Sequence, residues 1–500
     1  MDEAEASYRK VLQINPNAAE VHNNLGNILL DAGRLVEAEA CFRRAIQIKP
    51  DFAHPYTNLG TLLQRLGQFD NAVAHYRRAL ELKPDYVMAH SNLIFALDMM
   101  VIDDPASLYE ERKQWNAAHA AHIHRQSAHL NTAIPDRRIR IGYVSADLRR
   151  HSAPSAFGGM LTSYDRSQFD VVAYSNLRGS SDDLTELFKQ NVTAWRDIAG
   201  LSDDAAAKMI MEDRIDILVD LSGHSSGNRL LVFARKPAPI QISAWGYASG
   251  TGLQAMDVLF SDSVILPPQI KPYFSEEIRY LPSVVGTFFI DPFPDVNQLP
   301  ALSNGAITFG SFNRLAKVSE LVCRAWAQVL LAIPDSRLIL KSSELDEAAI
   351  RERVARQLSN AGLALDRVTM LGKTSWHEHM RAYHQIDIAL DPFPHGGGIT
   401  ALEGLMMGVP IINLCGSTLP GRLSASIMTT LGFSDWIATS SEQYVDLAIQ
   451  KSADLQSLAT LRRQLRGIFN SSVLGDQVAY ARAVEAEYRK LWQERCSRVR

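Results

Sequence analysis

The sequence predicts an all-α helical solenoid followed by two doubly wound α/β domains. Three observations lead to this prediction. The first hundred residues repeat with a period of about 34 residues. From residue 139 onward, short strand-like apolar runs alternate with helix-like ones, which is typical of parallel sheets covered by helices. A proline-rich stretch then divides these runs into two series. A chain of 500 residues exceeds what one hydrophobic core holds, so several domains are expected.

The repeat becomes visible when the chain is superposed on itself. Small residues recur where two helices must approach closely, and large apolar residues recur at helical spacing. Each unit closes with a proline, which cannot continue a helix. We expect two complete units at 19–52 and 53–86, a half unit before them, and another that opens near Tyr86. The matching positions are Leu25-Gly26 with Leu59-Gly60, Ala38 with Ala72, Phe42 with Tyr76, Ala45 with Ala79, and Pro50 with Pro84.

One polar position also recurs, as Asn24, Asn58 and Asn92. An amide both donates and accepts hydrogen bonds, so a row of amides can bind a peptide backbone without reading its side chains. Alternatively, each asparagine caps or bonds a neighbouring helix. We predict that these three residues bind peptide.

Composition excludes several classes of protein. The net charge of −4 gives no general attraction to nucleic acid or to an anionic membrane. The chain has neither a long apolar run nor a signal-peptide layout. Its four cysteines lie far apart without a ligand pattern, which indicates reduced thiols and a cytoplasmic protein. His119, His122 and His124 lie in an alanine-rich helical stretch, where packing and surface roles are expected, so we predict no metal site.

We divide the chain into four parts. These are the solenoid at 1–100, a helical connector at 101–136, a first α/β domain at 137–290 and a second at 291–500, whose last helix can cross back to the first. The connector is expected to hold one helix from Pro105 to about His129. The prolines at 292, 294 and 300 form the expected hinge.

The predicted strands follow the apolar runs. Ligands of such sheets bind at the carboxyl ends of the strands, so the cleft between the two domains is the expected active site. The strands are expected at 139–145, 169–174, 215–221, 240–244, 258–260 and 278–281 in the first domain, and at 307–312, 337–340, 367–371, 386–390, 409–414 and 436–437 in the second.

The strongest motif spans residues 390–410. A strand runs into a glycine-rich turn that contains Gly397 and Gly398, and a helix opens near Thr400. Glycines allow close backbone approach, and a helix N-terminus offers N–H groups and a positive dipole to a phosphate. Glu403, one turn further on, can accept hydrogen bonds from a ribose diol. We therefore predict a nucleotide diphosphate site that includes these four residues.

Two other segments can contribute to this site. Asn313, Arg314 and Lys317 follow the first strand of the second domain, and the Lys317 ammonium suits a leaving group that gains negative charge. His379 can stack on a flat base, with Arg381 beside it. The alternatives are a solvated surface lysine and an ordinary amphipathic helix.

Two histidines follow strands of the first domain, His151 and His224. Imidazole titrates near neutral pH, so either can act as general base or bind the acceptor and the sugar. The alternative for each is a buried structural histidine. We predict catalytic roles for both, together with Lys317.

The repeat resembles the tetratricopeptide repeat, and the whole chain resembles the protein O-GlcNAc transferases, nearest to the short bacterial type. The resemblance implies a GT-B fold, an inverting mechanism without an essential metal or other cofactor, UDP-GlcNAc as donor, and transfer to Ser or Thr hydroxyls of proteins. By position it implies that His151 lies in the active site, Lys317 meets the diphosphate, His379 and Arg381 lie by the uracil, and Thr400 and Glu403 contact phosphate and ribose. The residues that carry it are the repeats, Arg138–Asp147 with His151, Lys236–Gln241, Ser311–Asn313, Lys317 and 390–410.

This sequence also departs from the family pattern. Gly398-Ile399-Thr400 replaces His-Thr-Thr, Glu403 replaces Asp, Arg314 replaces Gln, and Trp376 replaces Lys. Three alternatives therefore stay open. They are the same fold with GDP-fucose or a UDP-hexose as donor, a repeat scaffold that only binds a nucleotide sugar, and a transferase that acts on a small molecule or lipid.

Overall fold

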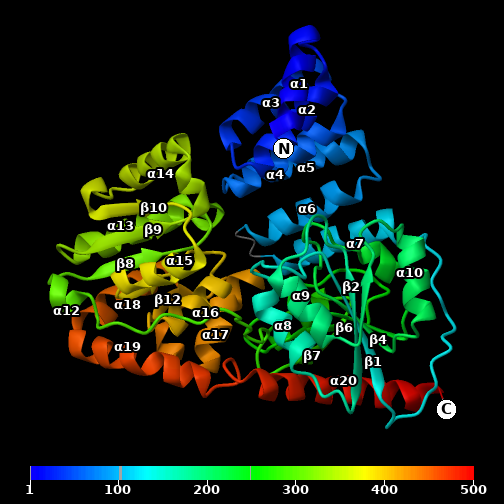
Figure 1. Ribbon diagram of the computed structural model, residues 1–500. Coiled ribbons are helices and arrows are strands. Elements are labelled where there is room, and N and C mark those ends of the chain that lie inside the picture. Colours follow the sequence, from blue (N-terminus) through cyan, green and yellow to red (C-terminus); the bar gives the residue numbers. More distant parts are fainter. Residues whose placement is uncertain (1, 101–103, 248, 500) are drawn as a thin grey trace.

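The computed structural model describes residues 2–100, 104–247 and 249–499. A helical solenoid stands above two α/β domains, with the first domain and the second side by side (Figure 1). The two predicted repeat units are confirmed as the helix pairs α2/α3 and α4/α5. The solenoid consists of α1 (Asp2–Ile14), α2 (Ala19–Asp31), α3 (Leu35–Ile48), α4 (Ala53–Arg65), α5 (Phe69–Leu82) and α6 (Val87–Asp98).

The recurring glycines are required by helix packing. A Cβ atom on Gly26 would lie 2.5 Å from the Phe42 ring, and one on Gly60 would lie 2.6 Å from the Tyr76 ring. Both rings are fully buried. Each unit therefore closes by pressing an aromatic ring of its second helix onto a glycine of its first.

The connector is less helical than predicted. Helix α7 (Pro105–His119) is capped by Asp104 and ends at His119, about ten residues before the predicted end. The prediction failed because the next segment bonds to the first domain instead of to itself: Gln126 N donates to Arg235 O at 2.9 Å, and His129 Nε2 lies 2.9 Å from Lys236 O. The predicted boundary at residue 101 lies outside the described residues.

The first domain is a seven-stranded parallel sheet in the order β3-β2-β1-β4-β5-β6-β7. The six predicted strands are present, and β3 is additional, a half-exposed edge strand without an apolar run. Its strands are β1 (Ile139–Ser145), β2 (Phe169–Ser175), β3 (Ala194–Asp197), β4 (Ile217–Asp220), β5 (Ile240–Ser243), β6 (Val258–Ser261) and β7 (Glu277–Tyr280). Its helices are α8 (Pro154–Thr162), α9 (Asp183–Asn191), α10 (Asp203–Glu212) and α11 (Leu230–Ala234).

The second domain is a six-stranded parallel sheet in the order β10-β9-β8-β11-β12-β13, and all six strands occur where predicted. They are β8 (Thr308–Ser311), β9 (Arg337–Lys341), β10 (Val368–Leu371), β11 (Ile388–Leu390), β12 (Ile411–Leu414) and β13 (Ile437–Ala438). The α-helices are α12 (Ala301–Asn304), α13 (Glu320–Ala332), α14 (Ala348–Asn360), α15 (Trp376–Ala382), α16 (Ile399–Met406), α17 (Leu423–Thr430), α18 (Ser441–Ala453) and α19 (Leu455–Asn470).

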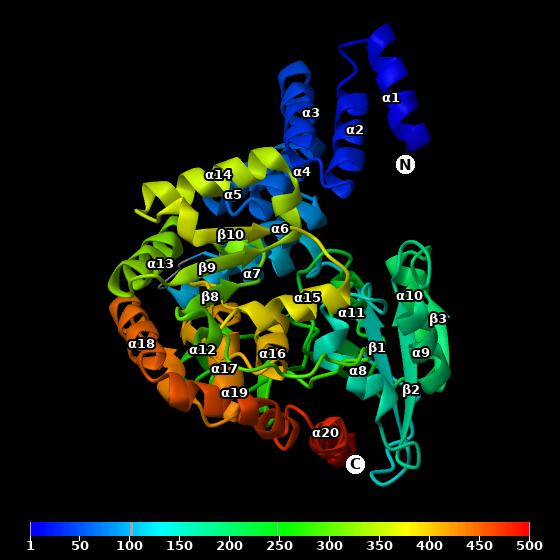
Figure 2. The same ribbon diagram turned by 60° about the vertical axis from the view of Figure 1, so that its left-hand side comes forward.

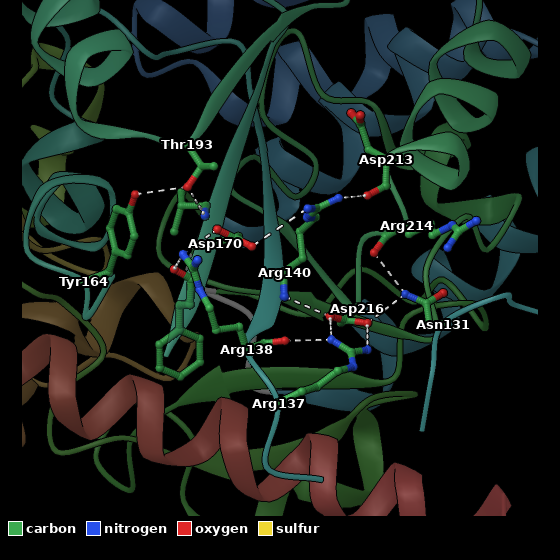
Figure 3. Close-up of polar contacts among 12 residues, drawn as sticks. Asn131, Arg137, Arg138, Arg140, Tyr164, Asp170, Thr193, Asp213, Arg214 and Asp216 are labelled. Atoms are coloured by element: carbon green, nitrogen blue, oxygen red, sulfur yellow. Dashed lines mark hydrogen bonds and ion pairs between the residues drawn. The ribbon is translucent and has the colours of Figure 1, made fainter. Parts of the chain in front are cut away.

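A buried carboxylate fixes the start of the first sheet. Asp216 accepts hydrogen bonds from the Arg137 guanidinium at 2.5 and 2.7 Å, from Asn131 Nδ2 at 2.7 Å and from Arg140 N at 2.8 Å (Figure 3). Two side chains of the connector and its continuation and the start of β1 are thereby tied to the residue that precedes β4. The basic run at 137–140 thus has a structural role at the end of the sheet away from the cleft.

The last helix, α20 (Gln477–Val499), packs beneath the first domain (Figure 1). Tyr488 Oη lies 3.1 Å from Tyr143 Oη, Trp245 Nε1 donates to Tyr480 Oη at 2.7 Å, and Trp492 Nε1 donates to Ile134 O at 3.0 Å. The chain therefore returns to the first domain after completing the second.

The solenoid is anchored to the first domain through a buried ion pair. Arg112 of α7 pairs with Asp98 of α6 at 2.6 Å and donates to Ser249 Oγ at 2.6 Å and Gly250 O at 2.8 Å. Among the helices of the described residues, none combines the length and the apolar character needed to span a bilayer.

Candidate active site

The glycine-rich turn is held by a buried carboxylate at the end of β11. Asp391 accepts hydrogen bonds from Gly397 N at 2.7 and 2.9 Å and from Ser424 Oγ at 2.6 Å. A Cβ on Gly397 would lie 2.8 Å from this carboxylate and 2.7 Å from Thr400 Oγ1. Burial raises the pKa of Asp391, and the hydrogen bond from Ser424 and the charge of Lys317 oppose that rise. The turn therefore presses closely on Asp391 and leads directly into α16.

Lys317 reaches this turn from the other strand end. Its Nζ donates to Gly396 O at 2.6 Å and lies 3.5 Å from Asn313 Oδ1, which also accepts from Thr400 Oγ1 at 3.0 Å. Burial lowers the pKa of Lys317 to about 8, with Asp391 opposing and Arg314 adding to the effect. The first N–H groups of a helix have no intrahelical acceptor, which gives the start of α16 a positive character. The Lys317 ammonium lies beside this helix end, and the two together suit a diphosphate.

A second cluster lies one turn along α16. His379 Nε2 lies 3.4 Å from Glu403 Oε2, and the Tyr383 hydroxyl lies 3.5 Å from the same oxygen. The ring centroids of Phe312 and His379 are 5.6 Å apart. The residues predicted to bind the base and the ribose are thus neighbours, and they adjoin the glycine-rich turn through Thr400. Arg381, two residues beyond His379 on the same helix, is exposed and does not join them.

His151 lies in the loop that follows β1 in the first domain, within range of the charge of Arg314 in the second. Its side chain is 36% exposed, and its Nδ1 lies 3.6 Å from Asp147 Oδ1. Partial burial lowers the pKa of His151, Asp147 opposes this effect, and the charge of Arg314 from the second domain adds to it. The adjacent Arg150 pairs with Asp183 and Asp291 at 2.6 Å and so fixes the loop. Arg314 is exposed, and its charge acts on both His151 of the first domain and Lys317 of the second.

His224 does not join the site, and its predicted catalytic role requires correction. The ring is fully buried. Its Nε2 lies 2.8 Å from Thr251 O and its Nδ1 lies 3.2 Å from Ser91 Oγ in the solenoid. Burial lowers the pKa of His224 to about 3. With both ring nitrogens bonded and the ring neutral, His224 joins α6 to the first domain instead of facing a substrate.

Two of the three recurring asparagines form hydrogen bonds between successive repeats. Asn58 Nδ2 donates to Asn23 Oδ1 at 2.8 Å, and Asn92 Nδ2 lies 3.3 Å from Thr61 Oγ1. Asn24 is exposed. Asn58 and Asn92 therefore bond to a neighbouring helix, as the alternative interpretation expects. Peptide binding by these residues stays a prediction.

Sequence reasoning missed several residues of the site. Asp391 had a detectable signal, because it directly follows a strand and precedes the glycine-rich turn. Ser424 and Tyr383 had none, since their roles depend on packing between distant segments. His395 was also missed. Its Nδ1 is buried without a hydrogen-bond partner in the described part of the chain, and burial together with Lys317 and Arg314 lowers its pKa well below the usual value.

Among the described residues, no group of three or more His, Cys, Asp or Glu is arranged to hold a metal ion. His119 instead lies 3.0 Å from His90, which lies 3.1 Å from Glu111. Burial lowers the pKa of His119 to about 4. This histidine therefore belongs to the packing between α6 and α7.

Two parallel-sheet domains, with a lysine and a glycine-rich turn at the strand ends of one and a histidine loop facing them from the other, define a two-lobed protein of the GT-B type. The chain belongs to glycosyl transferase family 41, whose model matches residues 109–299 and 295–484. A tetratricopeptide repeat model matches residues 17–85. The expected family and repeat are thus confirmed.

Known proteins resemble this chain over different lengths. A structure of an O-GlcNAc transferase mutant from Thermobaculum terrenum is 34% identical, with a TM-score of 0.93, and covers 99% of this chain and 95% of that one. The probable UDP-N-acetylglucosamine–peptide N-acetylglucosaminyltransferase SPINDLY of Solanum lycopersicum is 36% identical over 78% of this chain and 42% of its own length. The probable enzyme of that type named SEC, from Arabidopsis thaliana, is 28% identical over 72% of this chain and 38% of its own length. The chain spans less than half the length of these curated relatives.

Proposed function

We propose that the protein is an inverting glycosyltransferase that moves GlcNAc from UDP-GlcNAc to Ser or Thr hydroxyls of proteins. The observation that carries this proposal is the Lys317 ammonium, bonded to Gly396 O at 2.6 Å beside the N-terminus of α16. The activity named for its relatives supports the donor and the protein acceptor.

The proposed reaction is a direct displacement at the anomeric carbon. The acceptor oxygen forms a bond to this carbon from the face opposite the nucleotide, while the bond to the diphosphate oxygen breaks and its electron pair leaves with UDP. Lys317 and the N–H groups that open α16 stabilise the charge that develops on the leaving diphosphate. Glu403 and His379 hold the ribose and the base.

The acceptor proton goes to His151, to a chain of waters or to the donor phosphate. Two features support His151: its ring is partly exposed, and its Nδ1 lies 3.6 Å from the Asp147 carboxylate, which orients the ring. The lowered pKa keeps the imidazole neutral near neutral pH, as a base must be.

The proposed acceptor is a protein or peptide that lies along the solenoid, and the half-exposed amides of Asn58 and Asn92 support this route. We propose no nucleic acid, membrane or metal partner. The cytoplasm is the proposed location, because the four cysteines lie far apart without a disulfide or ligand pattern.

Isothermal titration of the full chain with UDP-GlcNAc, UDP-glucose and GDP-fucose tests the donor. We expect UDP-GlcNAc to bind, and Lys317→Ala to bind it more weakly. We also expect slow hydrolysis of the bound donor, and loss of this hydrolysis in His151→Ala. Binding of GDP-fucose alone would replace the named sugar. Absence of binding by all three nucleotides would refute the enzyme. Donor binding without any transfer or hydrolysis would favour the alternative of a repeat scaffold that only binds a nucleotide sugar.

A further inference from the structure

The turn between α4 and α5 of the solenoid packs against the donor site of the second domain. Gly67 in this turn has a φ of +74°, and a Cβ atom placed on it would lie 3.0 Å from Ala316 O and 3.3 Å from Ala316 Cα. Both surfaces are backbone, which cannot move aside as a flexible side chain can. Ala316 directly precedes Lys317, so the repeat domain contacts the segment that presents the donor lysine.

Polar contacts surround this packing and keep the solenoid on the second domain. The Glu347 carboxylate accepts from Leu35 N at 3.0 Å and from Val36 N at 3.3 Å, and so caps α3 from another domain. Arg353 donates to Leu66 O at 3.2 Å, next to Gly67. Figure 2 shows α14, which carries Arg353, beside α4 and α5.

We propose that the Gly67 turn is a positioning element for Lys317, so that the repeat domain forms part of the support of the donor site. This inference rests on the proposed function and deepens it. It assigns to the solenoid a role in donor binding that is separate from any contact with the acceptor.

The geometry of the segment explains why it needs support. Leu315–Lys317 is a single 3-10 turn, η2, closed by Lys317 N to Arg314 O at 3.0 Å and Val318 N to Leu315 O at 2.9 Å. So short a helix gains little rigidity from its own hydrogen bonds. The Lys317 bond to Gly396 O is 2.6 Å long, and hydrogen bonds of this kind weaken beyond about 3.2 Å. A displacement of a few tenths of an ångström at Ala316 therefore changes how Lys317 meets a diphosphate.

The repeat supplies a matched control. Gly33 occupies the equivalent turn of the preceding unit with a φ of +78°, and a Cβ on it would meet nothing within 4 Å. Alanine at either position bears the same left-handed backbone strain. Only at Gly67 would the new methyl group press on Ala316.

Titration of the full-length variants with UDP tests the proposal. We expect Gly33→Ala to bind UDP as the wild type does and Gly67→Ala to bind about tenfold more weakly, on the scale of a misplaced charged contact. The pH dependence of UDP binding should shift in Gly67→Ala alone, because the surroundings of Lys317 change. Equal affinities in the two variants would overturn the proposal.

A second pair keeps the test decisive if Gly67→Ala does not fold. Glu347→Ala removes the cap on α3 and leaves the turn intact, and Glu352→Ala on the exposed side of α14 is its control. We expect weaker UDP binding in Glu347→Ala only, and unchanged binding there would contradict the proposal. If the wild type itself binds neither UDP nor any of the three donors, the proposed function fails; if it binds UDP and the variants do not differ, only this inference fails.

Discussion

His151 and His224 follow two strands of one sheet, yet their surroundings differ. His151 stands in a partly exposed loop that faces the second domain, whereas His224 is fully buried. The His224 ring packs edge-on against Trp115, with centroids 5.1 Å apart. The same residue type at the same kind of position is thus structural where it is buried and available to a substrate where it is partly exposed.

Replacing His224 should affect stability. We expect His224→Ala to lower the free energy of unfolding by about 2–4 kcal/mol, because it removes two buried hydrogen bonds and leaves a cavity beside Trp115. Urea unfolding measures this loss. The matched variant, His151→Ala, should change stability by less than about 0.5 kcal/mol. If His151 is the base, turnover should fall by about 10²–10⁴-fold. A stable His224→Ala enzyme with lost turnover would reverse these assignments.

Lys317 should make donor binding depend on pH. In the free protein burial lowers the pKa of this lysine to about 8. A bound diphosphate stabilises the ammonium and raises its pKa, so binding takes up a proton above that value, and affinity falls as pH rises. Between about pH 7 and about pH 9 we expect up to a tenfold loss of UDP affinity, measured by calorimetry.

Two variants test whether Lys317 causes this pH dependence of UDP binding. Lys317→Ala should bind UDP more weakly by about 1.5–3 kcal/mol and lose the pH dependence in this range. Lys373→Ala removes an exposed lysine of the same domain and should keep the wild-type UDP affinity and its pH dependence. If the pH dependence survives in Lys317→Ala, another group titrates.

At the scale of elements, two helical glycines illustrate opposite outcomes of one substitution. Gly60 lies under the Tyr76 ring, whereas Gly467 in α19 is exposed, with nothing within 4 Å of an added Cβ. Alanine is favoured over glycine in a helix by about 1 kcal/mol when nothing obstructs it. Packing reverses this preference where two helices cross.

We therefore expect Gly60→Ala to destabilise the protein by about 1–3 kcal/mol, because the methyl group overlaps a buried ring. Gly467→Ala should instead stabilise it by about 0.5–1 kcal/mol. Thermal denaturation followed by circular dichroism compares the two. A stabilising Gly60→Ala would mean that α4 and α5 can separate without cost.

Most elements were predictable because their signals are local. Buried parallel strands appear as apolar runs, and all the predicted strands are present. Strand β3 was missed because Ala194–Asp197 lies at a half-exposed edge and carries two charged residues. The connector helix was overextended because its later residues bond to Arg235 and Lys236, which no local pattern announces.

At the scale of the whole molecule, the two domains are joined by more than their linker. Helix α20 follows the second domain and packs on the first, and its Tyr480, Tyr488 and Trp492 are 1–2% exposed. The solenoid is linked to the first domain through the Asp98–Arg112 ion pair. It contacts the second domain through Gly67 and through the start of α3, which Glu347 caps. Such contacts were beyond sequence reasoning, since they join residues hundreds of positions apart. The donor cluster was predictable in part, because its residues follow strands whose carboxyl ends meet at one edge.

Trp492 should stabilise both domains together. We expect Trp492→Ala to lower the free energy of unfolding by about 3–5 kcal/mol, because it empties a buried site and leaves Ile134 O without its indole donor. Calorimetry should show one transition at a lower temperature. Two separate transitions would show that α20 does not couple the domains. Gln493→Ala, at an exposed neighbouring position, is the control and should change little.

The contact at Gly67 also bears on how such proteins can be engineered. Because the proposed donor site packs against the second complete repeat, units added ahead of α1 should lengthen the proposed acceptor surface without displacing Lys317. Exchanging the repeat that holds Gly67 would alter the acceptor surface and the position of Lys317 at the same time. The length of the acceptor surface can thus be changed without changing donor binding at the N-terminal end of the solenoid. At the end that contacts the second domain, a change in one also changes the other.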